Sequence, residues 1–235
     1  MVEVRNLSFS YSKRRILKDV SFSVSPGETV CVVGANGAGK TTLLRIMATL
    51  AIPDSGSVLL DGQDAFARPL RYRRQLGYLP EKFSLYEDMT VKDFLHYRAA
   101  LKGEPPKRIR RRVGEAVQMC SVADILRRSI RSLSAGEKKR VALADVLMLR
   151  PRLLLLDDFL AGLDCNMREM AGRILESAAA FSSVVVSGHE IDDFAKWGSR
   201  FLLLKEGRLA SCVCASDFER DNLPSVIRKE LSGER

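Results

Sequence analysis

The segment from Gly34 to Thr42 has the composition and spacing of a phosphate-binding loop. It fits the pattern G-x-x-x-x-G-K-[ST], in which glycines let the backbone curl so that its N–H groups point at bound phosphates. Lys40 would place a positive charge on the β- and γ-phosphates of a nucleotide, and the Thr41 hydroxyl would ligate Mg²⁺. We therefore predict a nucleotide phosphate site formed by Gly34, Ala35, Asn36, Gly37, Ala38, Gly39, Lys40, Thr41 and Thr42.

The residues on either side of this loop support that interpretation. Thr29–Val33 is a short apolar run typical of a buried strand, and Thr41–Leu50 carries apolar residues at helical spacing. The loop would then join a strand to the N-terminus of a helix, which attracts anions. A glycine-rich turn that matched the pattern by chance would not be expected to lie between a buried strand and a helix.

An aspartate at the end of a second apolar run could complete a metal site. Leu153–Leu156 predicts a buried strand, and Asp157 follows it directly. A buried carboxylate is costly unless it is paired, and Mg²⁺ beside the phosphate-binding loop is its natural partner. Since this pattern alone is common, the neighbouring motifs decide the assignment.

Further motifs follow in a fixed order. Leu133–Arg140 stands at the start of a predicted helix, Ala161–Asp164 follows the second strand, and Ser187–His189 ends a third. With the phosphate-binding loop they resemble the signature, D-loop and switch-histidine motifs of the ATP-binding cassette (ABC) family, over essentially the whole chain. The family signature is usually written L-S-G-G-Q, and Ala135 and Glu137 are variants at its third and fifth positions.

The resemblance implies a head-to-tail dimer that encloses two ATP molecules, each with Mg²⁺. Ser134, Gly136 and Glu137 of one subunit would contact the ATP bound to the other. His189 would hydrogen-bond the γ-phosphate and the attacking water in its own subunit, although taken alone it could be a surface histidine. Tyr11 stands where family members place an aromatic ring under the adenine, a stacking contact worth ~1–3 kcal/mol.

Two positions depart from the family pattern. The catalytic carboxylate is normally a glutamate, and here it is Asp158, which is one methylene shorter. Because a misplacement on the ångström scale can cost about 10²-fold in rate, we expect slow ATP hydrolysis, with a nucleotide clamp as the alternative. Glu81 takes the place of the Q-loop glutamine, and we assign it to both the catalytic and the metal site because a carboxylate can ligate Mg²⁺.

Short apolar runs alternate with helical patterns along the chain, which favours an α/β fold. The resemblance adds a P-loop NTPase core with a mixed or parallel sheet flanked by helices, an N-terminal antiparallel β subdomain and an inserted α-helical signature subdomain. We predict a single ABC ATPase domain over residues 1–235, with the nucleotide-binding core in 1–90 and 151–213, the helical subdomain in 91–150 and a C-terminal helical tail in 214–235.

The periodicity also predicts individual elements. Between residues 91 and 149 only helical patterns occur. The other predicted strands are Val2–Ser10, Val20–Val24, Val58–Leu60, Leu76–Leu79, Val184–Ser187, Phe201–Leu204 and Arg208–Val213, and the other predicted helices are Val91–Leu101, Pro106–Met119, Ala135–Leu149, Ser216–Glu219 and Leu223–Leu231.

The formal net charge of +9 is concentrated between Lys107 and Arg140. Such a basic cluster can be a solvated helix face, a surface for anionic lipid or a nucleic-acid site. We favour the solvated face, keep contact with anionic lipid as an alternative, and expect no nucleic acid.

The apolar runs are too short to cross a bilayer, and the N-terminus lacks the basic and apolar regions of a signal peptide. The five cysteines show no paired zinc spacing, so reduced thiols are expected. We therefore predict a cytoplasmic protein that reaches the cytoplasmic face of the membrane through transmembrane permease subunits. Its dimer partner would be a second copy or a paralogous ABC subunit.

The resemblance leaves several functions to compare. A DNA-maintenance ATPase would insert a long coiled coil before the signature, and a translation factor would carry two cassettes; neither pattern occurs here. Iron–sulfur assembly remains an alternative to a transport subunit. Leu85–Val91 resembles a stretch in the ATPases of simple bacterial exporters, so we expect transport, and export rather than import.

Overall fold

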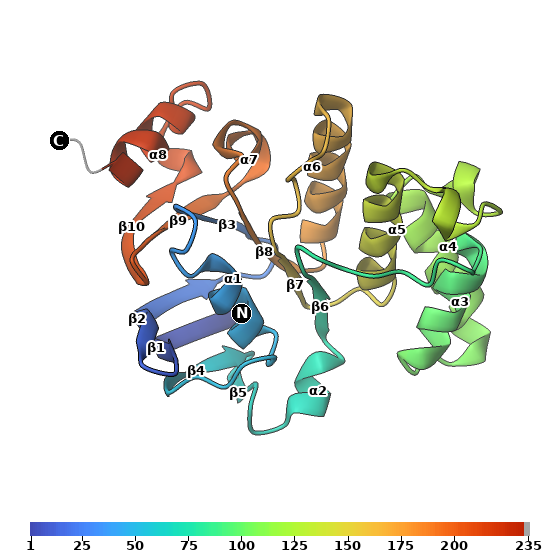
Figure 1. The fold of residues 1–235 in the computed structure, drawn as a ribbon, viewed down its shortest axis with the longest axis horizontal. Coiled ribbons are helices and arrows are strands. Elements are labelled where there is room, and N and C mark those ends of the chain that lie inside the picture. Colours follow the sequence, from blue (N-terminus) through green and yellow to red (C-terminus); the bar gives the residue numbers. More distant parts are fainter. Residues whose placement is uncertain (233–235) are drawn as a thin grey trace.

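Two β-sheets and the helices around them make up the fold (Figure 1). The computed structural model describes residues 1–232; residues 233–235 of the predicted helical tail lie outside the described residues. The larger sheet has six strands in the order β10-β9-β3-β8-β7-β6. These strands are β3 (Thr29–Val33), β6 (Leu76–Leu79), β7 (Leu153–Leu156), β8 (Ser183–Gly188), β9 (Arg200–Lys205) and β10 (Arg208–Cys214).

Most of this sheet is parallel. Only β10 runs antiparallel to its neighbour β9, to which it is joined by the turn at Glu206 and Gly207. In a parallel sheet the loops that follow the strands emerge at the same edge, where ligands usually bind. The loops after β3, β6, β7 and β8 therefore meet at one edge, and each of them carries a predicted site residue.

Both faces of the six-stranded sheet are buried. Val30 and Val32 of β3 face one hydrophobic core, whereas Cys31 and Val33 face the other. The first core lies towards helix α1 (Lys40–Met47) and the second towards the remaining large helices. Because a strand covered on both faces has no polar side, β3 and β7 appear in the sequence as unbroken apolar runs.

The N-terminal part of the chain forms a four-stranded antiparallel sheet in the order β2-β1-β4-β5. Its apolar side chains share a core with Leu43, Leu44 and Ile46 of α1. This arrangement confirms the predicted antiparallel β subdomain. The strands are β1 (Val2–Tyr11), β2 (Arg14–Val24), β4 (Ser55–Leu60) and β5 (Gln63–Asp64).

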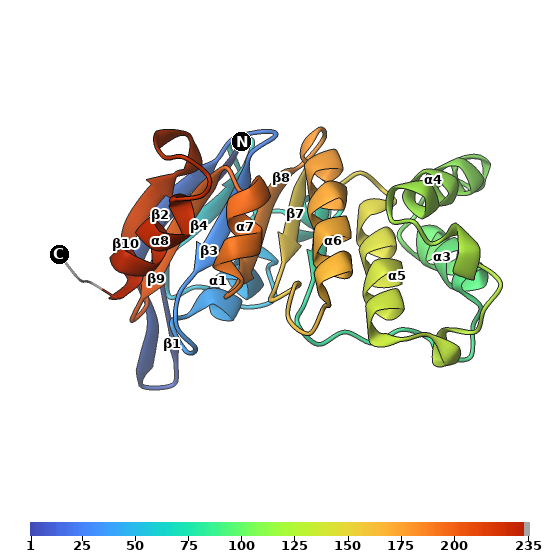
Figure 2. The same cartoon turned by 90° about the horizontal axis from the view of Figure 1, so that it is seen from above.

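Three helices gather at the end of the molecule away from the antiparallel sheet, and Figures 1 and 2 show them from two sides. They confirm the predicted helical insertion. Thr90 caps the first by accepting a hydrogen bond from the Asp93 amide, and Pro106 begins the second. The helices are α3 (Val91–Leu101), α4 (Pro106–Met119) and α5 (Ala135–Leu147), and the 3₁₀ turns Ala123–Ile125 and Ile130–Ser132 join the last two.

Two helices end earlier than the periodicity predicts. α1 ends at Met47 and α5 at Leu147, rather than two or three residues later. The backbone turns left-handed soon after each end, at Thr49 with a φ of 57° and at Arg150 with a φ of 51°. Since a left-handed residue cannot continue a right-handed helix, apolar spacing alone overestimates both lengths.

Three helices lie where the patterns predict no element. In α6 the side chain of Asp164 accepts a hydrogen bond from the Met167 amide at 2.8 Å and caps the helix. Ile174 and Leu175 then bury one face of it against the sheet. The three helices are α2 (Pro69–Arg73), α6 (Cys165–Ala179) and α7 (Ile191–Trp197).

The described chain ends in helix α8 (Leu223–Ser232), which packs against α7 and β9. A 3₁₀ turn, Ala215–Asp217, replaces the predicted helix Ser216–Glu219. Within residues 1–232, no helix is both long enough and apolar enough to span a membrane.

The basic cluster is partly neutralised within the molecule. Lys107, Arg108 and Arg110 on α4 make no ion pair with the described residues, but most of the other cations in this region have acidic partners within 4 Å. This pairing favours the solvated face over a surface for lipid. The paired members are Arg111, Arg112, Arg128, Arg131 and Lys138.

Candidate nucleotide-binding site

Residues from distant parts of the sequence meet in a pocket of about 320 Å³ at the carboxyl edge of the parallel strands. We call it the P-loop pocket. It brings together the phosphate-binding loop and the loops after β6, β7 and β8. Its lining residues are Arg14, Ile16, Asn36, Gly37, Gly39, Lys40, Thr41, Thr42, Glu81, Asp158 and His189.

The phosphate-binding loop needs glycine at Gly39. Its φ of 108° lies in the left-handed region, and a Cβ there would stand 2.8 Å from the side chain of Leu17. Helix α1 begins at the next residue, Lys40. The free N–H groups of the first helical turn therefore point into the pocket, where they can bind phosphate.

Lys40 lies inside the loop with only 8% of its surface exposed. Its ammonium donates to the carbonyl oxygens of Gly34 at 2.6 Å and Ala35 at 3.2 Å, and it lies 3.2 Å from Nε2 of His189. Because an ammonium can only donate, Nε2 is the acceptor in this contact. Burial lowers the pKa of Lys40, and nearby carboxylates oppose that effect. His189 is thus part of the site rather than an isolated surface histidine.

Asp157 is 2% exposed and is held by two hydroxyl groups. Its Oδ1 accepts hydrogen bonds from Thr41 Oγ1 at 3.1 Å and from Ser187 Oγ at 2.6 Å. Ser187 Oγ in turn accepts one from the Asp158 amide at 3.1 Å. Sequence reasoning assigned no role to Ser187, although its place just before His189 in a buried strand is a signal that could have found it.

The donor set of this pocket fits Mg²⁺. The Thr41 hydroxyl and the Asp157 carboxylate meet, and the Glu81 carboxylate lines the same pocket, so all three predicted ligands offer oxygen. Mg²⁺ prefers oxygen and usually takes one or two carboxylates together with substrate phosphates. Residues 1–232 contain no cluster of three or more His, Cys, Asp and Glu side chains that could hold a metal. A metal here would therefore need the phosphates of a nucleotide.

Asp158 has an unusual backbone and an unfilled acceptor. Its φ is 47°, and its Oδ1 is buried without a hydrogen-bond donor among residues 1–232. Burial raises the pKa of Asp158, as does the charge of Glu190, while His189 and Lys40 act in the opposite direction. A buried oxygen that lacks a donor at the wall of a pocket is suited to bind a water molecule.

The signature residues stand outside the P-loop pocket. Ser134 caps α5 by accepting a hydrogen bond from the Glu137 amide at 3.2 Å, and Glu137 accepts one from the Ser134 amide at 2.7 Å. Arg128 pairs with the other carboxylate oxygen of Glu137 at 2.7 Å. Ser134, Gly136 and Glu137 do not line the pocket of their own chain.

Tyr11 also lies outside the P-loop pocket. Its side chain is 45% exposed and meets the ring of Phe9 edge-on, with centroids 4.8 Å apart. Arg14 and Ile16 line the pocket instead, from the strand that pairs with the one carrying Tyr11. Sequence reasoning missed both residues, because their approach to the loop depends on the β1–β2 hairpin.

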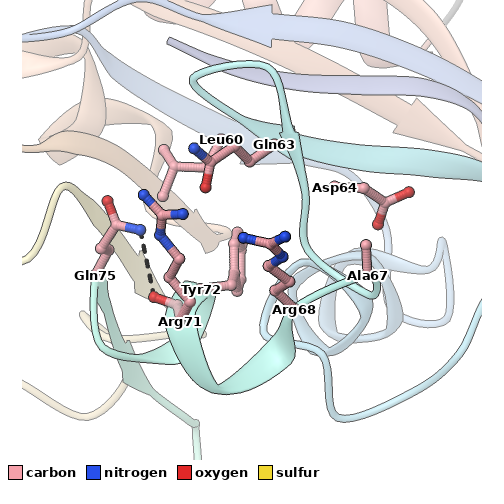
Figure 3. Close-up of a pocket in the computed structure, with 8 residues that line it drawn as sticks. All are labelled: Leu60, Gln63, Asp64, Ala67, Arg68, Arg71, Tyr72 and Gln75. Atoms are coloured by element: carbon pink, nitrogen blue, oxygen red, sulfur yellow. Dashed lines mark hydrogen bonds between the residues drawn. The ribbon is translucent and has the colours of Figure 1, made fainter.

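A second pocket of about 280 Å³ lies between α2 and the β4–β5 turn (Figure 3). Arg68 and Arg71 extend along one side of it, and none of the predicted site residues lines it. The Tyr72 hydroxyl below it donates to the carbonyl oxygen of Met47 at 2.6 Å, which ties α2 to the end of the P-loop helix. The nucleotide chemistry predicted from the sequence therefore does not belong to this second pocket.

Comparison with known families decides the identity of the chain. The sequence model of the family described as ABC transporter matches residues 17–161, which include the P-loop, the signature and Asp157. The chain belongs to the ABC transporter family. The predicted family and the predicted fold class are confirmed.

Similar proteins place this ABC cassette among ATP-binding subunits. The molybdate/tungstate import ATP-binding protein WtpC of Pyrococcus horikoshii is 33% identical over 232 residues, which cover 97% of this chain and 66% of that protein. The chain spans only 57% to 66% of the length of the first curated relatives that it matches.

Two solved structures show the same architecture. One, titled as the ATP binding subunit of an ABC transporter, has a TM-score of 0.86 and 28% identity, and the match covers 100% of this chain and 98% of that one. The other is a dimeric, post-hydrolysis state of the ATP-binding cassette MJ0796 bound to ADP and Pi. Its TM-score is 0.80 with 25% identity, and the match covers 92% of this chain and 99% of that one.

Proposed function

We propose that this ABC cassette is the ATP-binding and ATP-hydrolysing subunit of a transporter. The observation that carries the proposal is the meeting of five groups at the P-loop pocket. Lys40 lies against His189, the Thr41 hydroxyl reaches the Asp157 carboxylate, and Asp158 lines the same pocket. Phosphate binding, metal binding and activation of water can therefore take place at adjacent atoms.

The chain's own residues would divide the binding task. The N–H groups of the P-loop and the Lys40 ammonium would hold the β- and γ-phosphates, while Thr41, Asp157 and Glu81 would hold Mg²⁺. When bound, the metal neutralises charge that develops on the phosphate oxygens. The ammonium of Lys40 would exchange its bonds to Gly34 and Ala35 for bonds to phosphate.

Asp158 and His189 would act on water. A water oxygen attacks the γ-phosphorus, the bond from that phosphorus to the bridging oxygen of ADP breaks, and the water proton passes to a carboxylate. The carboxylate of Asp158, which lines the pocket, would be the acceptor that this step requires. His189 would hydrogen-bond the γ-phosphate and orient the water once the Lys40 ammonium leaves its Nε2 for phosphate.

We infer that the complete site forms only in a dimer. Ser134, Gly136 and Glu137 stand outside their own P-loop pocket, which is what a contact with the ATP of an opposite subunit requires. The dimeric state of the similar cassette MJ0796 supports this arrangement. The opposite subunit is a second copy of this chain or a paralogous ABC subunit.

We further propose that the dimer works on transmembrane permease subunits at the cytoplasmic face of the membrane. Similarity to an import ATP-binding protein supports this role and favours import. The expectation of export, which came from residues 85–91, is not supported.

We propose the following division of the chain, in line with these roles. The nucleotide-binding core would comprise 1–90 and 151–213, since these residues build the two sheets and the P-loop pocket. The helical unit would comprise 91–150 and present the signature to the opposite subunit. The remainder, 214–235, would form a C-terminal tail.

Binding of ATP tests the first step. Lys40→Ala removes a charged donor, and such bonds contribute ~1.5–3 kcal/mol, so the affinity for Mg-ATP should fall at least about tenfold in a calorimetric titration. Lys229→Ala, on the exposed face of α8, is the matched control and should leave the affinity unchanged. If Lys40→Ala binds Mg-ATP as tightly as the wild type, the P-loop assignment is wrong.

A further inference from the structure

Lys139 connects the signature helix to the loop that carries Asp158. Its ammonium leaves α5 and donates to the carbonyl oxygen of Phe159 at 2.9 Å and to that of Ala161. The Phe159 ring lies 6.0 Å from the same ammonium. Residues 157–164, which we call the Asp158 loop, join β7 to α6. One side chain of α5 therefore holds two carbonyl groups of this loop.

The Asp158 loop is held by side chains from two other elements. Asp158 has a φ of 47°, in the left-handed region that few residues other than glycine, asparagine and aspartate enter. Ser187 holds the loop from the sheet, by accepting a hydrogen bond from the Asp158 amide at 3.1 Å. Lys139 holds the loop from the opposite direction, on the far side of Asp158 in the sequence.

The charge of Lys139 also suits this position. Burial lowers the pKa of Lys139, and Arg168 acts in the same direction, whereas the carboxylates of Asp158, Glu190 and Glu81 raise it. An ammonium among these three carboxylates reduces their mutual repulsion. Removing it would leave two carbonyl groups without a donor and three negative charges with less compensation.

We propose that Lys139 is a positioning residue for ATP hydrolysis, which clamps the Asp158 loop to the signature helix and so fixes the carboxylate of Asp158 at the wall of the P-loop pocket. This inference rests on the proposed function. The same helix begins at Ser134, which would contact the ATP of the opposite subunit. The signature helix would contact the ATP of the opposite subunit, and the Asp158 loop would stand beside the ATP of its own subunit. Lys139 thus links the position of the signature helix at one ATP to the position of the catalytic loop at the other.

The test replaces Lys139 with methionine, which keeps the length of the side chain and removes its charge and donors. Because ångström-scale misplacement of a catalytic group costs about 10²-fold, kcat for phosphate release should fall at least about tenfold while KM changes less than about threefold. Lys139→Arg retains charge and donors and should recover most of the loss. Lys138→Met is the matched control, since Lys138 is the adjacent residue and pairs at the surface with Glu87 at 2.8 Å.

Hydrogen exchange gives a second readout on the same full-length proteins. Amides of residues 158–161 should exchange faster in Lys139→Met than in the wild type, while those in the middle of α6 should not change. Lys139→Gln, which keeps a donor but not the charge, supplies the same comparison if the methionine variant does not fold.

Particular outcomes separate this inference from the proposed function. An unchanged kcat in Lys139→Met, a loss carried by KM alone, or unchanged exchange in residues 158–161 would each overturn the role of Lys139 and leave the proposed function intact. A wild-type protein that releases no phosphate would refute the proposed hydrolysis, and the inference with it.

Discussion

In the proposed mechanism, Asp158 would set how fast this cassette hydrolyses ATP. It is one methylene shorter than glutamate, its backbone is left-handed, and its buried Oδ1 has no donor among the described residues. Asn tolerates the left-handed region as well as Asp does and keeps the same shape. Since general bases contribute ~10²–10⁴-fold, Asp158→Asn should lower steady-state phosphate release at least about 10²-fold while calorimetry shows ATP still bound.

Asp158→Glu is the informative companion to that variant. The longer side chain brings the carboxylate closer to the water, so turnover should be preserved or raised, although glutamate at a φ of 47° costs ~1–2 kcal/mol of folding stability. If Asp158→Asn hydrolyses ATP at the wild-type rate, His189 alone positions the water. If the wild type shows no turnover and Asp158→Glu does not restore it, the nucleotide clamp is the better description.

Single residues were predictable where one stretch of sequence carries their chemistry. Lys40 and Thr41 belong to a spaced pattern, and Asp157 ends an apolar run, so their meeting follows from the topology of a parallel sheet. Ser187 precedes His189 and Lys139 lies within the signature motif, so the sequence marks the segments of both, but it does not show that they meet the Asp158 loop. Contacts of this kind depend on the packed fold.

At the scale of elements, the N-terminus of α5 shows why glutamate can stand at the fifth position of the signature, where the family usually has glutamine. Glu137 accepts a hydrogen bond from the Ser134 amide, pairs with Arg128 and completes a capping box. Glu137→Ala should reduce the free energy of unfolding by ~0.5–2 kcal/mol in urea denaturation at neutral pH. Glu137→Gln keeps the acceptor for the cap and should retain most of that stability.

The contribution of Glu137 should also depend on pH. Its hydrogen bond from the Ser134 amide lowers the pKa of Glu137 in the folded state. The stabilisation is therefore complete above the unfolded pKa and is lost as the pH falls through the folded value. The stability difference between wild type and Glu137→Gln should shrink in acid, and a constant difference down to pH ~3 would contradict the role of the carboxylate.

Elements were predictable from the sequence when burial gave them a clear pattern. The strands β3, β6 and β7 match the predicted bounds because their apolar residues are continuous. α6 was missed, although the cap at Asp164 and the buried pair Ile174 and Leu175 give a usable signal. α2 and α7 are short, and in a helix of one or two turns the apolar period is too brief to distinguish from a loop.

At the scale of the whole molecule, topology explains why one chain carries only part of its site. The parallel strands deliver the P-loop, Asp157, Asp158 and His189 to one edge, whereas the signature stands at the start of α5, on the far side of α6 from α7 (Figure 2), and does not line the P-loop pocket. The order of motifs predicted the core, because sequence order and strand order are linked by βαβ connections. The distance between the signature and the P-loop pocket of the same chain could not be read from that order, and it leads to the last prediction.

Ser134 should control dimerisation of the cassette rather than ATP binding by the single chain. It is exposed at the start of α5 and does not line its own P-loop pocket, so Ser134→Arg should leave ATP affinity of the monomer nearly unchanged and abolish ATP-dependent dimerisation. Loss of the cap alone would also weaken α5, and Ser134→Asp controls for this, since aspartate caps as well as serine but directs a negative charge at the phosphates of the opposite subunit. Both variants are measured by size-exclusion chromatography with light scattering, in an Asp158→Asn background that keeps ATP intact.

Two outcomes would contradict the head-to-tail arrangement. If either variant still dimerises with ATP as strongly as the wild type, the signature does not face the nucleotide of an opposite subunit. Loss of the dimer in Ser134→Arg but not in Ser134→Asp would assign the effect to the helix cap and would equally contradict the head-to-tail arrangement.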